Sequence, residues 1–169
     1  MTDLEQIADI DDEIEIEKTE FLSFIVGNET YGIKITEIEE IRVWQKPTLI
    51  PNVPDFVKGV INIRGMIIPI FDMRIRFGTS EINYLETTVI IVLKVKVSED
   101  KDKVIGLVVD AVADVLALAN DSVIPLQRES NLSEFINGIA QIENGLVTIL
   151  SSSSLSGFII ESEEIHHVK

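Results

Sequence analysis

Short apolar runs separated by glycine, proline and polar clusters characterise the chain from residue 21 onward. Residues 21–26 are almost continuously apolar, turn-forming residues fill 27–30, and the apolar pattern returns over 31–35. Runs of five or six residues bounded by turn residues are typical of β-strands. Two such runs across a short polar loop predict a β-hairpin at the start of the ordered chain.

One segment has a pattern that fits either a helix or a strand. Ile35, Ile38 and Ile41 recur every third residue with glutamates between them, which favours a short helical segment with Thr36 as a candidate N-cap. The alternation of apolar and polar residues over 41–44 fits a strand equally well. The pattern leaves both interpretations open.

The most informative stretch is bounded by Gly59 and Gly78. Two β-rich runs meet there at Arg64 and Gly65, which predicts a tight hairpin with the arginine at its turn. Pro69 has no N–H to donate to a ladder, so it is predicted to lie on an edge strand or at a bulge.

The second half of the chain repeats this organisation. Residues 87–95 and 104–109 form β-rich runs on either side of a polar turn, and residues 138–149 mirror the hairpin that starts at Gly59, about 80 positions later. We interpret this as a weak internal repeat of strand–turn–strand units. Many short strands predict a mostly β fold, and two half-size barrels fit a length of 169 residues.

The distribution of charge narrows the classes of partner. The net charge is −15, and the first twenty residues hold nine acids against Lys18 alone, which predicts a flexible acidic leader over residues 1–20. A role of this leader in docking a basic partner is the alternative. An acidic chain repels phosphate backbones and anionic lipid, so neither nucleic-acid binding nor membrane insertion is expected. Without a signal sequence or an apolar span, the chain is predicted to be cytoplasmic.

Candidate catalytic and metal-binding groups are few. Both histidines, His166 and His167, lie in the last four residues, and the absence of cysteine excludes a disulfide, a thiolate metal site and a cysteine nucleophile. Asp110 and Asp114, four apart on a strand, would lie ~13 Å from each other, too far for a glycosidase pair. The residues predict a binding protein without catalytic activity, metal or cofactor.

Arg64 is the candidate recognition residue. Its planar guanidinium at a hairpin tip is suited to pairing with a carboxylate on a partner. The alternative is an ion pair within the chain, to Glu39 or Glu40, and the two roles are compatible.

An ordered set of motifs matches a known family. In chain order they are residues 21–24, 31–33, 40–42, 59–65, Pro69, 72–78, 88–92 and 106–112. In this order and spacing they closely resemble the CheW family of bacterial chemotaxis coupling proteins. The resemblance covers about residues 21–150.

The resemblance implies both a fold and a function. The fold would be two five-stranded SH3-like β-barrels around a shared hydrophobic core with a few short helices, one barrel at about 21–82 and the other at about 83–150, with exchange of strands between them allowed. The function would be that of a non-enzymatic adaptor that links the tips of methyl-accepting chemotaxis receptors to the regulatory domain of the CheA histidine kinase, in receptor arrays at the inner membrane.

Two other functions compete with this one. A CheW-like adaptor of another two-component system, of the CheV type or a pilus-motility coupler, is the nearer alternative. An oligonucleotide-binding barrel would need basic strands interleaved with aromatic residues, whereas aromatic residues make up 6% of this acidic chain.

The resemblance also implies which residues lie on protein-binding surfaces. They are Ile38, Glu40, Ile41, Gly59 and Arg64 in the first barrel, and Val89, Gly106 and Val112 in the second. The chain departs from the family after residue 150, where serines and a glycine replace a typical helix. Because these residues are poor helix formers, residues 151–169 are predicted to hold a short or frayed helix and a tail.

Overall fold

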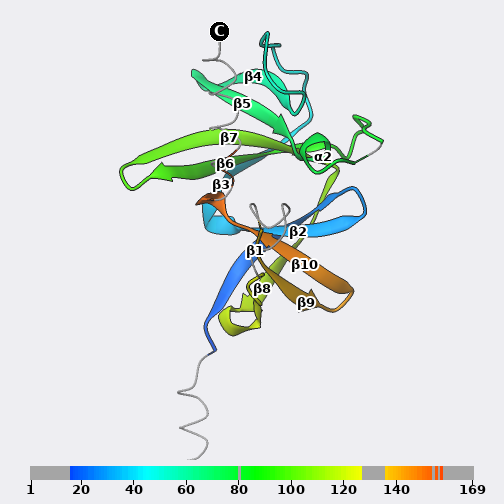
Figure 1. The fold of residues 1–169 in the computed structure, drawn as a ribbon, viewed down its shortest axis with the longest axis vertical. Coiled ribbons are helices and arrows are strands. Elements are labelled where there is room, and N and C mark those ends of the chain that lie inside the picture. Colours follow the sequence, from blue (N-terminus) through cyan, green and yellow to red (C-terminus); the bar gives the residue numbers. More distant parts are fainter. Residues whose placement is uncertain (1–15, 80, 127–135, 154, 156, 158–169) are drawn as a thin grey trace, which may run out of the picture.

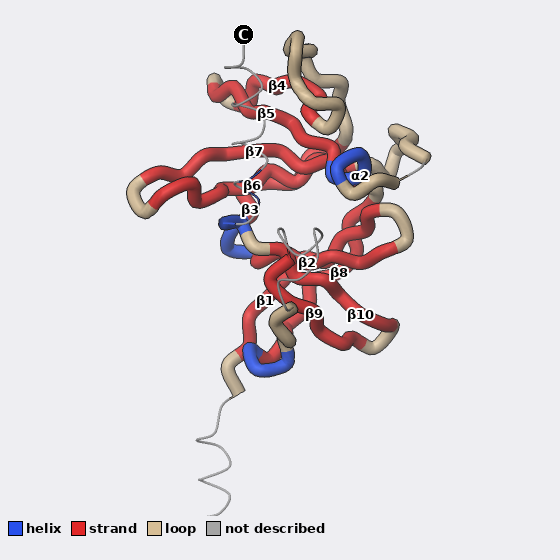
Figure 2. Tube along the Cα trace, in the orientation of Figure 1, coloured by secondary structure: helices blue, strands red, loops and turns tan. Residues whose placement is uncertain are grey.

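Ten strands in two five-stranded sheets make up most of the structure, a computed structural model that describes residues 16–79, 81–126, 136–153, 155 and 157 (Figures 1 and 2). The mostly β fold with two five-stranded units is therefore confirmed. No helix among the described residues is long and apolar enough to cross a membrane.

The central sheet is built from the middle of the chain. Its strand order is β3-β6-β7-β5-β4. The strands are β3 (Ile38–Val43), β4 (Val57–Ile63), β5 (Met66–Asp72), β6 (Val89–Ser98) and β7 (Lys101–Val109), with the short helix α2 (Met73–Arg76) after β5.

The terminal sheet is built from the two ends of the described chain. Its strand order is β8-β1-β2-β10-β9. The strands are β1 (Lys18–Val26), β2 (Glu29–Lys34), β8 (Ala111–Ala119), β9 (Ile136–Ile142) and β10 (Gly145–Leu150). Because β1 begins at Lys18, the last three residues of the predicted acidic leader belong to a strand.

The two sheets share one topology. In each, a parallel pair joins the third and fourth strands of the order, at Ile70 opposite Gly106 in the central sheet and at Ile149 opposite Gly32 in the terminal sheet. Each half of the chain supplies a hairpin to one sheet and three strands to the other. The division between the sheets therefore does not fall at residue 82.

The predicted hairpins form because their turns have the residues that tight turns require. β1 pairs with β2, β4 with β5, and β9 with β10, all antiparallel. At the β4–β5 turn, Arg64 and Gly65 have φ of 50° and 86°. Two positive φ values in a two-residue turn match the right-handed twist of the flanking strands.

The ambiguous isoleucine segment divides into a short helical turn and a strand. Ile35–Glu37 forms the 3₁₀ turn η1, and Ile38–Val43 pairs with β6 as β3. The proposed N-cap at Thr36 is wrong, because Lys34 occupies the cap position and no side chain caps the turn. Whether such a segment becomes a helix or a strand depends on its pairing with a neighbouring strand, and the local sequence pattern does not contain that information.

Pro69 lies in an inner strand, so the prediction of an edge or bulge position is wrong. It faces Val60, whose N–H and C=O instead exchange hydrogen bonds of 2.9 Å with Thr48. Val60 and Pro69 therefore form a pair without hydrogen bonds between them. The pairing of β5 with β7 begins only at Ile70, and Pro69 needs no N–H at its position.

A shared hydrophobic core joins the sheets. Phe24 and Ile33 from the terminal sheet pack with Phe71, Leu93 and other residues of the central sheet in one buried cluster. Each sheet also has one smaller buried cluster made of its own residues. Non-directional apolar burial thus holds the sheets face to face.

The start of the serine-rich segment is helical and anchored. Ser152, Ser153 and Leu155 have helical backbone, and the Leu155 N–H donates to the Ser151 carbonyl oxygen at 3.1 Å. The Leu155 side chain is fully buried in the shared core. The rest of the predicted tail, including His166 and His167, lies outside the described residues.

Glu37 is a half-buried carboxylate beside this helical segment. Burial raises its pKa, and a side-chain hydrogen bond with Ser152 and the charge of Lys34 lower it by less. Its Oε2 atom is buried without a hydrogen-bond partner among the described residues. The charged form of Glu37 is therefore disfavoured in the fold.

We expect Glu37→Gln to change how stability depends on pH. A raised carboxyl pKa contributes stability that is present below the unfolded value and is lost as pH rises through the folded value. The free energy of unfolding of the unsubstituted chain should thus fall relative to that of the variant as pH rises through and above the ordinary titration range of glutamate, about pH 4. Urea titrations across that range measure the difference, and a constant difference would contradict the assignment.

We expect Gly59→Ala to destabilise the fold strongly. Gly59 has a φ of 132°, and an added Cβ would lie 2.7 Å from the carbonyl carbon of Thr48. Backbone strain and this clash together should cost about 3 kcal/mol or more in urea unfolding. Gly65→Ala is the matched control, because its φ is also positive but the added Cβ meets nothing within 4 Å. That control should lose only about 1 kcal/mol.

Candidate functional site

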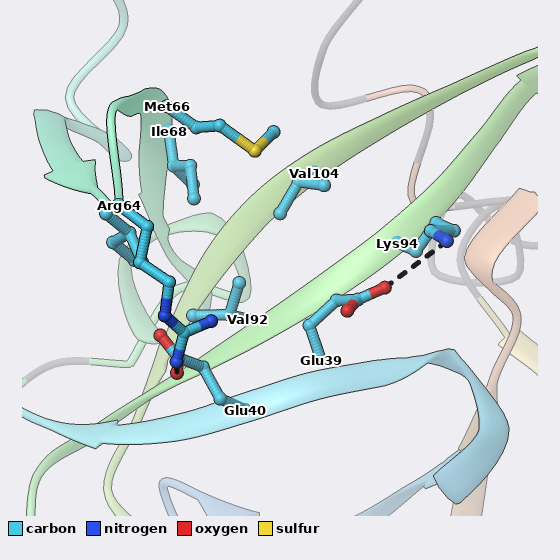
Figure 3. A pocket seen from close by; sticks show the side chains of 9 residues that line it. Glu39, Glu40, Arg64, Met66, Ile68, Val92, Lys94 and Val104 are labelled. Carbon is cyan, nitrogen blue, oxygen red and sulfur yellow. Dashed lines mark hydrogen bonds and ion pairs between the residues drawn. The ribbon is translucent and has the colours of Figure 1, made fainter.

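Arg64 projects from the tip of the β4–β5 hairpin toward β3. Its side chain is 81% exposed, and its Nη2 donates to Oε2 of Glu40 at 2.9 Å (Figure 3). The other oxygen of Glu40 accepts from Nη1 of Arg42 at 3.0 Å. The predicted ion pair within the chain thus forms with Glu40. This ion pair joins two residues that are 24 positions apart in the chain and holds the exposed guanidinium beside β3.

A pocket of about 330 Å³ lies beside this ion pair. Its apolar lining comes from four strands and its rim is charged, with Lys94 paired to Glu39 at 3.4 Å (Figure 3). The full lining is Glu39, Glu40, Ile63, Arg64, Met66, Ile68, Val92, Lys94 and Val104. An apolar floor with a few fixed charges is suited to receiving an apolar side chain and orienting its neighbours.

The remaining first-barrel residues divide between surface and framework. Ile41 is 45% exposed and lies with Val43, which is 73% exposed, along the edge strand β3. Ile38 is partly buried against the shared core. Gly59 is buried, and its backbone approaches Thr48 closely. Of the five residues predicted here, only Glu40, Ile41 and Arg64 therefore offer a side chain to a partner.

Of the three residues predicted to lie in the second barrel, Val89 and Gly106 lie in the central sheet, and only Val112 lies in the terminal sheet. Val89 and Val112 are partly buried and, like Ile38, pack against the shared core. Gly106 is buried inside the central sheet, where an added Cβ would lie 2.5 Å from Cδ1 of Ile70. The structure thus groups the three aliphatic side chains around one core and separates them from Gly106.

A buried ion network centred on Arg74 of α2 was not predicted from the sequence. The guanidinium of Arg74 is fully buried, and it contacts Asp72 through Nε at 3.0 Å and through Nη2 at 2.8 Å. Its Nη1 donates to Asp110 at 3.2 Å and to the Asn83 carbonyl oxygen at 2.6 Å. Burial alone would lower the pKa of Arg74, but the carboxylates of Asp72 and Asp110 hold that pKa above its ordinary value.

The same network connects the two sheets. Asp110 follows β7, and its Oδ2 accepts from the Gly27 N–H at 2.7 Å in the β1–β2 turn. The Asp110 N–H donates to the Ile25 carbonyl oxygen at 2.9 Å. Asp110 is therefore a structural anchor and not half of a carboxylate pair with Asp114.

Two aromatic rings extend the network to the surface. The Tyr84 hydroxyl donates to Asp72 at 3.2 Å, the Arg74 guanidinium lies 4.9 Å from the Tyr84 ring centre, and Trp44 stacks on Tyr84 at 4.1 Å. Burial, and then the charge of Asp72, raise the pKa of the Tyr84 hydroxyl. This hydroxyl therefore stays protonated as a donor to Asp72.

A sequence signal for the network does exist. Asp72 and Arg74 interrupt an apolar run from Ile68 to Ile75, and charges inside such a run are costly to bury unless they are paired. The identity of the third partner, Asp110, depends on tertiary structure.

We expect Arg74→Met to cost about 3–5 kcal/mol of stability in urea unfolding, because it leaves the buried Asp72 carboxylate without its counter-charge. Lys94→Met is the matched control, since it removes an ion pair whose side chains are about half exposed. Such a pair contributes about 0–1 kcal/mol. Equal losses in the two variants would refute a structural role for the network.

Known proteins resemble the chain along nearly all of its described length. The model of the CheW-like domain family matches residues 20–157. Chemotaxis protein CheW of Klebsiella aerogenes is 38% identical over 148 residues, which are 86% of this chain and 84% of the relative. Chemotaxis protein CheW of Bacillus subtilis is 30% identical over 136 residues, which are 78% and 83% of the two chains.

A solved structure agrees with the fold. The crystal structure of the scaffolding protein TtCheW from Thermoanaerobacter tengcongensis superposes with a TM-score of 0.72 at 29% identity, covering 80% of this chain and 90% of that one. These matches support an adaptor in chemotaxis signalling and do not support the alternative two-component role. The chain belongs to the CheW-like domain family, and it is an adaptor of bacterial chemotaxis signalling.

Proposed function

We propose that this chain links the cytoplasmic tips of chemoreceptors to the regulatory domain of the CheA histidine kinase. The observation that carries the proposal is the exposed Arg64 guanidinium, held by Glu40 at the rim of an apolar pocket. A fixed charge beside an apolar floor is a feature of protein-recognition surfaces. The similarity to a scaffolding protein supports a role in binding, without catalysis.

The eight predicted binding residues divide into direct and indirect roles in this proposal. Glu40 and Arg64 contact a partner at the pocket that they line, and Ile41 contacts a partner through its exposed side chain on the edge strand β3. Ile38, Val89 and Val112 set the spacing between the sheets from their places at the shared core. Gly59 and Gly106 act through the backbone, because larger residues would displace their neighbours.

Signal transfer then needs no chemistry within the chain. An adaptor that holds receptor and kinase in one cytoplasmic array shifts the kinase between states according to its differential affinity for them. Individual contacts of micromolar strength suffice, because linking several of them raises the effective concentration. The buried ion network keeps the two sheets in one relative position, so a change at the surface of one sheet affects the other sheet.

We expect Arg64→Glu to weaken binding of the purified chain to a receptor tip, a CheA regulatory domain, or both, by about tenfold or more. The substitution breaks the ion pair with Glu40 and places a third acid beside Glu39 and Glu40 at the pocket rim. Isothermal titration against each partner measures the change. Because Arg64 is 81% exposed, the free energy of unfolding should change little.

Lys101→Glu is the matched control for Arg64→Glu. It makes the same change of net charge at an exposed residue, the first of β7, away from the pocket lining. The control should bind as the unsubstituted chain does. A folded unsubstituted chain that binds neither partner would refute the coupling function.

A further inference from the structure

A second surface on the central sheet is a groove of about 250 Å³ beside the end of β3. It is lined by Trp44, Lys46, Pro47, Leu49, Lys58 and Tyr84. It shares no residue with the pocket beside Arg64, so a partner bound there does not need the Arg64 surface.

The groove is rigid and partly apolar. Trp44 and Tyr84 stack at 4.1 Å, and Tyr84 in turn rests on the buried Arg74. Thr48, which lies between the lining residues Pro47 and Leu49 in the chain, is held to β4 by two hydrogen bonds of 2.9 Å. Leu49 is nevertheless 73% exposed. A preformed aromatic surface with an exposed leucine loses little order when it binds an apolar side chain.

The groove is also a basic site in an acidic protein. Lys46 and Lys58 flank the aromatic pair, and neither takes part in an ion pair within the part of the chain that the structure describes. The chain as a whole has a net charge of −15. Two lysines without counter-charges beside apolar rings favour a segment that is both acidic and apolar.

The N-terminal residues of this chain have that chemistry. Residues 1–15 contain seven acids and no basic residue, and Leu4, Ile7, Ile10 and Ile14 recur among the acids every three or four positions. These residues combine the negative charge and the apolar side chains that the groove selects.

The position of β1 favours the N-terminal segment of another molecule over that of the same one. β1 begins at one end of the long axis of the molecule, whereas β4 and the preceding loop lie toward the other end (Figure 1). Fifteen residues span at most about 50 Å when fully extended. To reach its own groove, the segment would have to run back past the terminal sheet, but a neighbour's groove imposes no such path.

We propose that the groove binds the acidic N-terminal segment, residues 1–15, of a second copy of this chain, so that copies associate head to tail. Such a contact joins two different surfaces, so it builds open chains or rings and not a symmetric pair. It depends on salt, because lysine–carboxylate attraction at an exposed surface is screened.

The test uses two full-length variants, each lacking one half of the contact. Lys46→Glu with Leu49→Asp alters two exposed groove residues and keeps the acidic segment. The second variant converts the seven acids of residues 1–15 to Asn or Gln and keeps the groove. In sedimentation velocity, the unsubstituted chain should associate more as concentration rises, and each variant alone should associate about tenfold more weakly or less.

Mixing the two variants is the decisive step. One supplies the intact acidic segment and the other the intact groove, so the mixture should form a one-to-one complex that grows no further. Raising salt from about 0.1 M to about 1 M shortens the screening length from about 10 Å to about 3 Å and should dissociate the complex. Lys101→Glu, which makes a single charge reversal away from the groove, should associate as the unsubstituted chain does.

Trp44 provides a readout at the site itself, since it is the single tryptophan of the chain. Its emission should shift to longer wavelength when the associated chain is diluted, and should not shift in the variant with the neutral N-terminal segment. The proposal is overturned if the unsubstituted chain stays monomeric at every concentration or if the mixture forms no complex. It is also overturned if the Trp44 emission wavelength does not change with concentration, which would indicate binding within one molecule. Partner binding through Arg64 is measured separately and can succeed or fail on its own.

Discussion

The relative position of the two sheets depends on a single guanidinium, that of Arg74, which is buried where they meet. Apolar packing presses the sheets together but is non-directional, and it tolerates a range of rotations. The carboxylates of Asp72 and Asp110 remove that freedom, because both charges need the arginine at hydrogen-bond distance and Asp110 also accepts from the Gly27 N–H of the other sheet. The charge network therefore selects one arrangement among those that the core permits.

The two candidate binding surfaces belong to the central sheet and differ in character. The Arg64 pocket has an apolar floor and a rim of paired charges, whereas the Trp44 groove has aromatic rings and lysines without partners among the described residues. Tyr84 connects the groove to Arg74 by stacking and to Asp72 by a hydrogen bond. An adaptor benefits from this arrangement, because separate surfaces on one rigid sheet can hold different partners at a constant spacing.

Local pattern predicted the elements well and the long-range contacts poorly. The three hairpins follow from short apolar runs around turn residues, and the turn at Arg64 and Gly65 needs only local backbone preferences. The segment from Ile35 to Ile41 stayed ambiguous because β6, its pairing partner, is about fifty residues away. The Arg64–Glu40 pair was predicted as one of two alternatives, while the contact of Arg74 with Asp110 joins residues 36 apart and has no local signature.

The exchange of strands between the halves has a consequence for synthesis on the ribosome. β3 to β7 are consecutive, so the central sheet can be completed as soon as residue 109 has emerged. β1 and β2 emerge earlier, yet β8 and β10, their neighbours in the sheet, are made last. The first hairpin must therefore wait with two apolar edges unpaired, and such edges are prone to aggregation. The strands made first are the ones whose edges remain unpaired longest. The β1–β2 hairpin is therefore the segment with the greatest need of a chaperone that binds nascent chains.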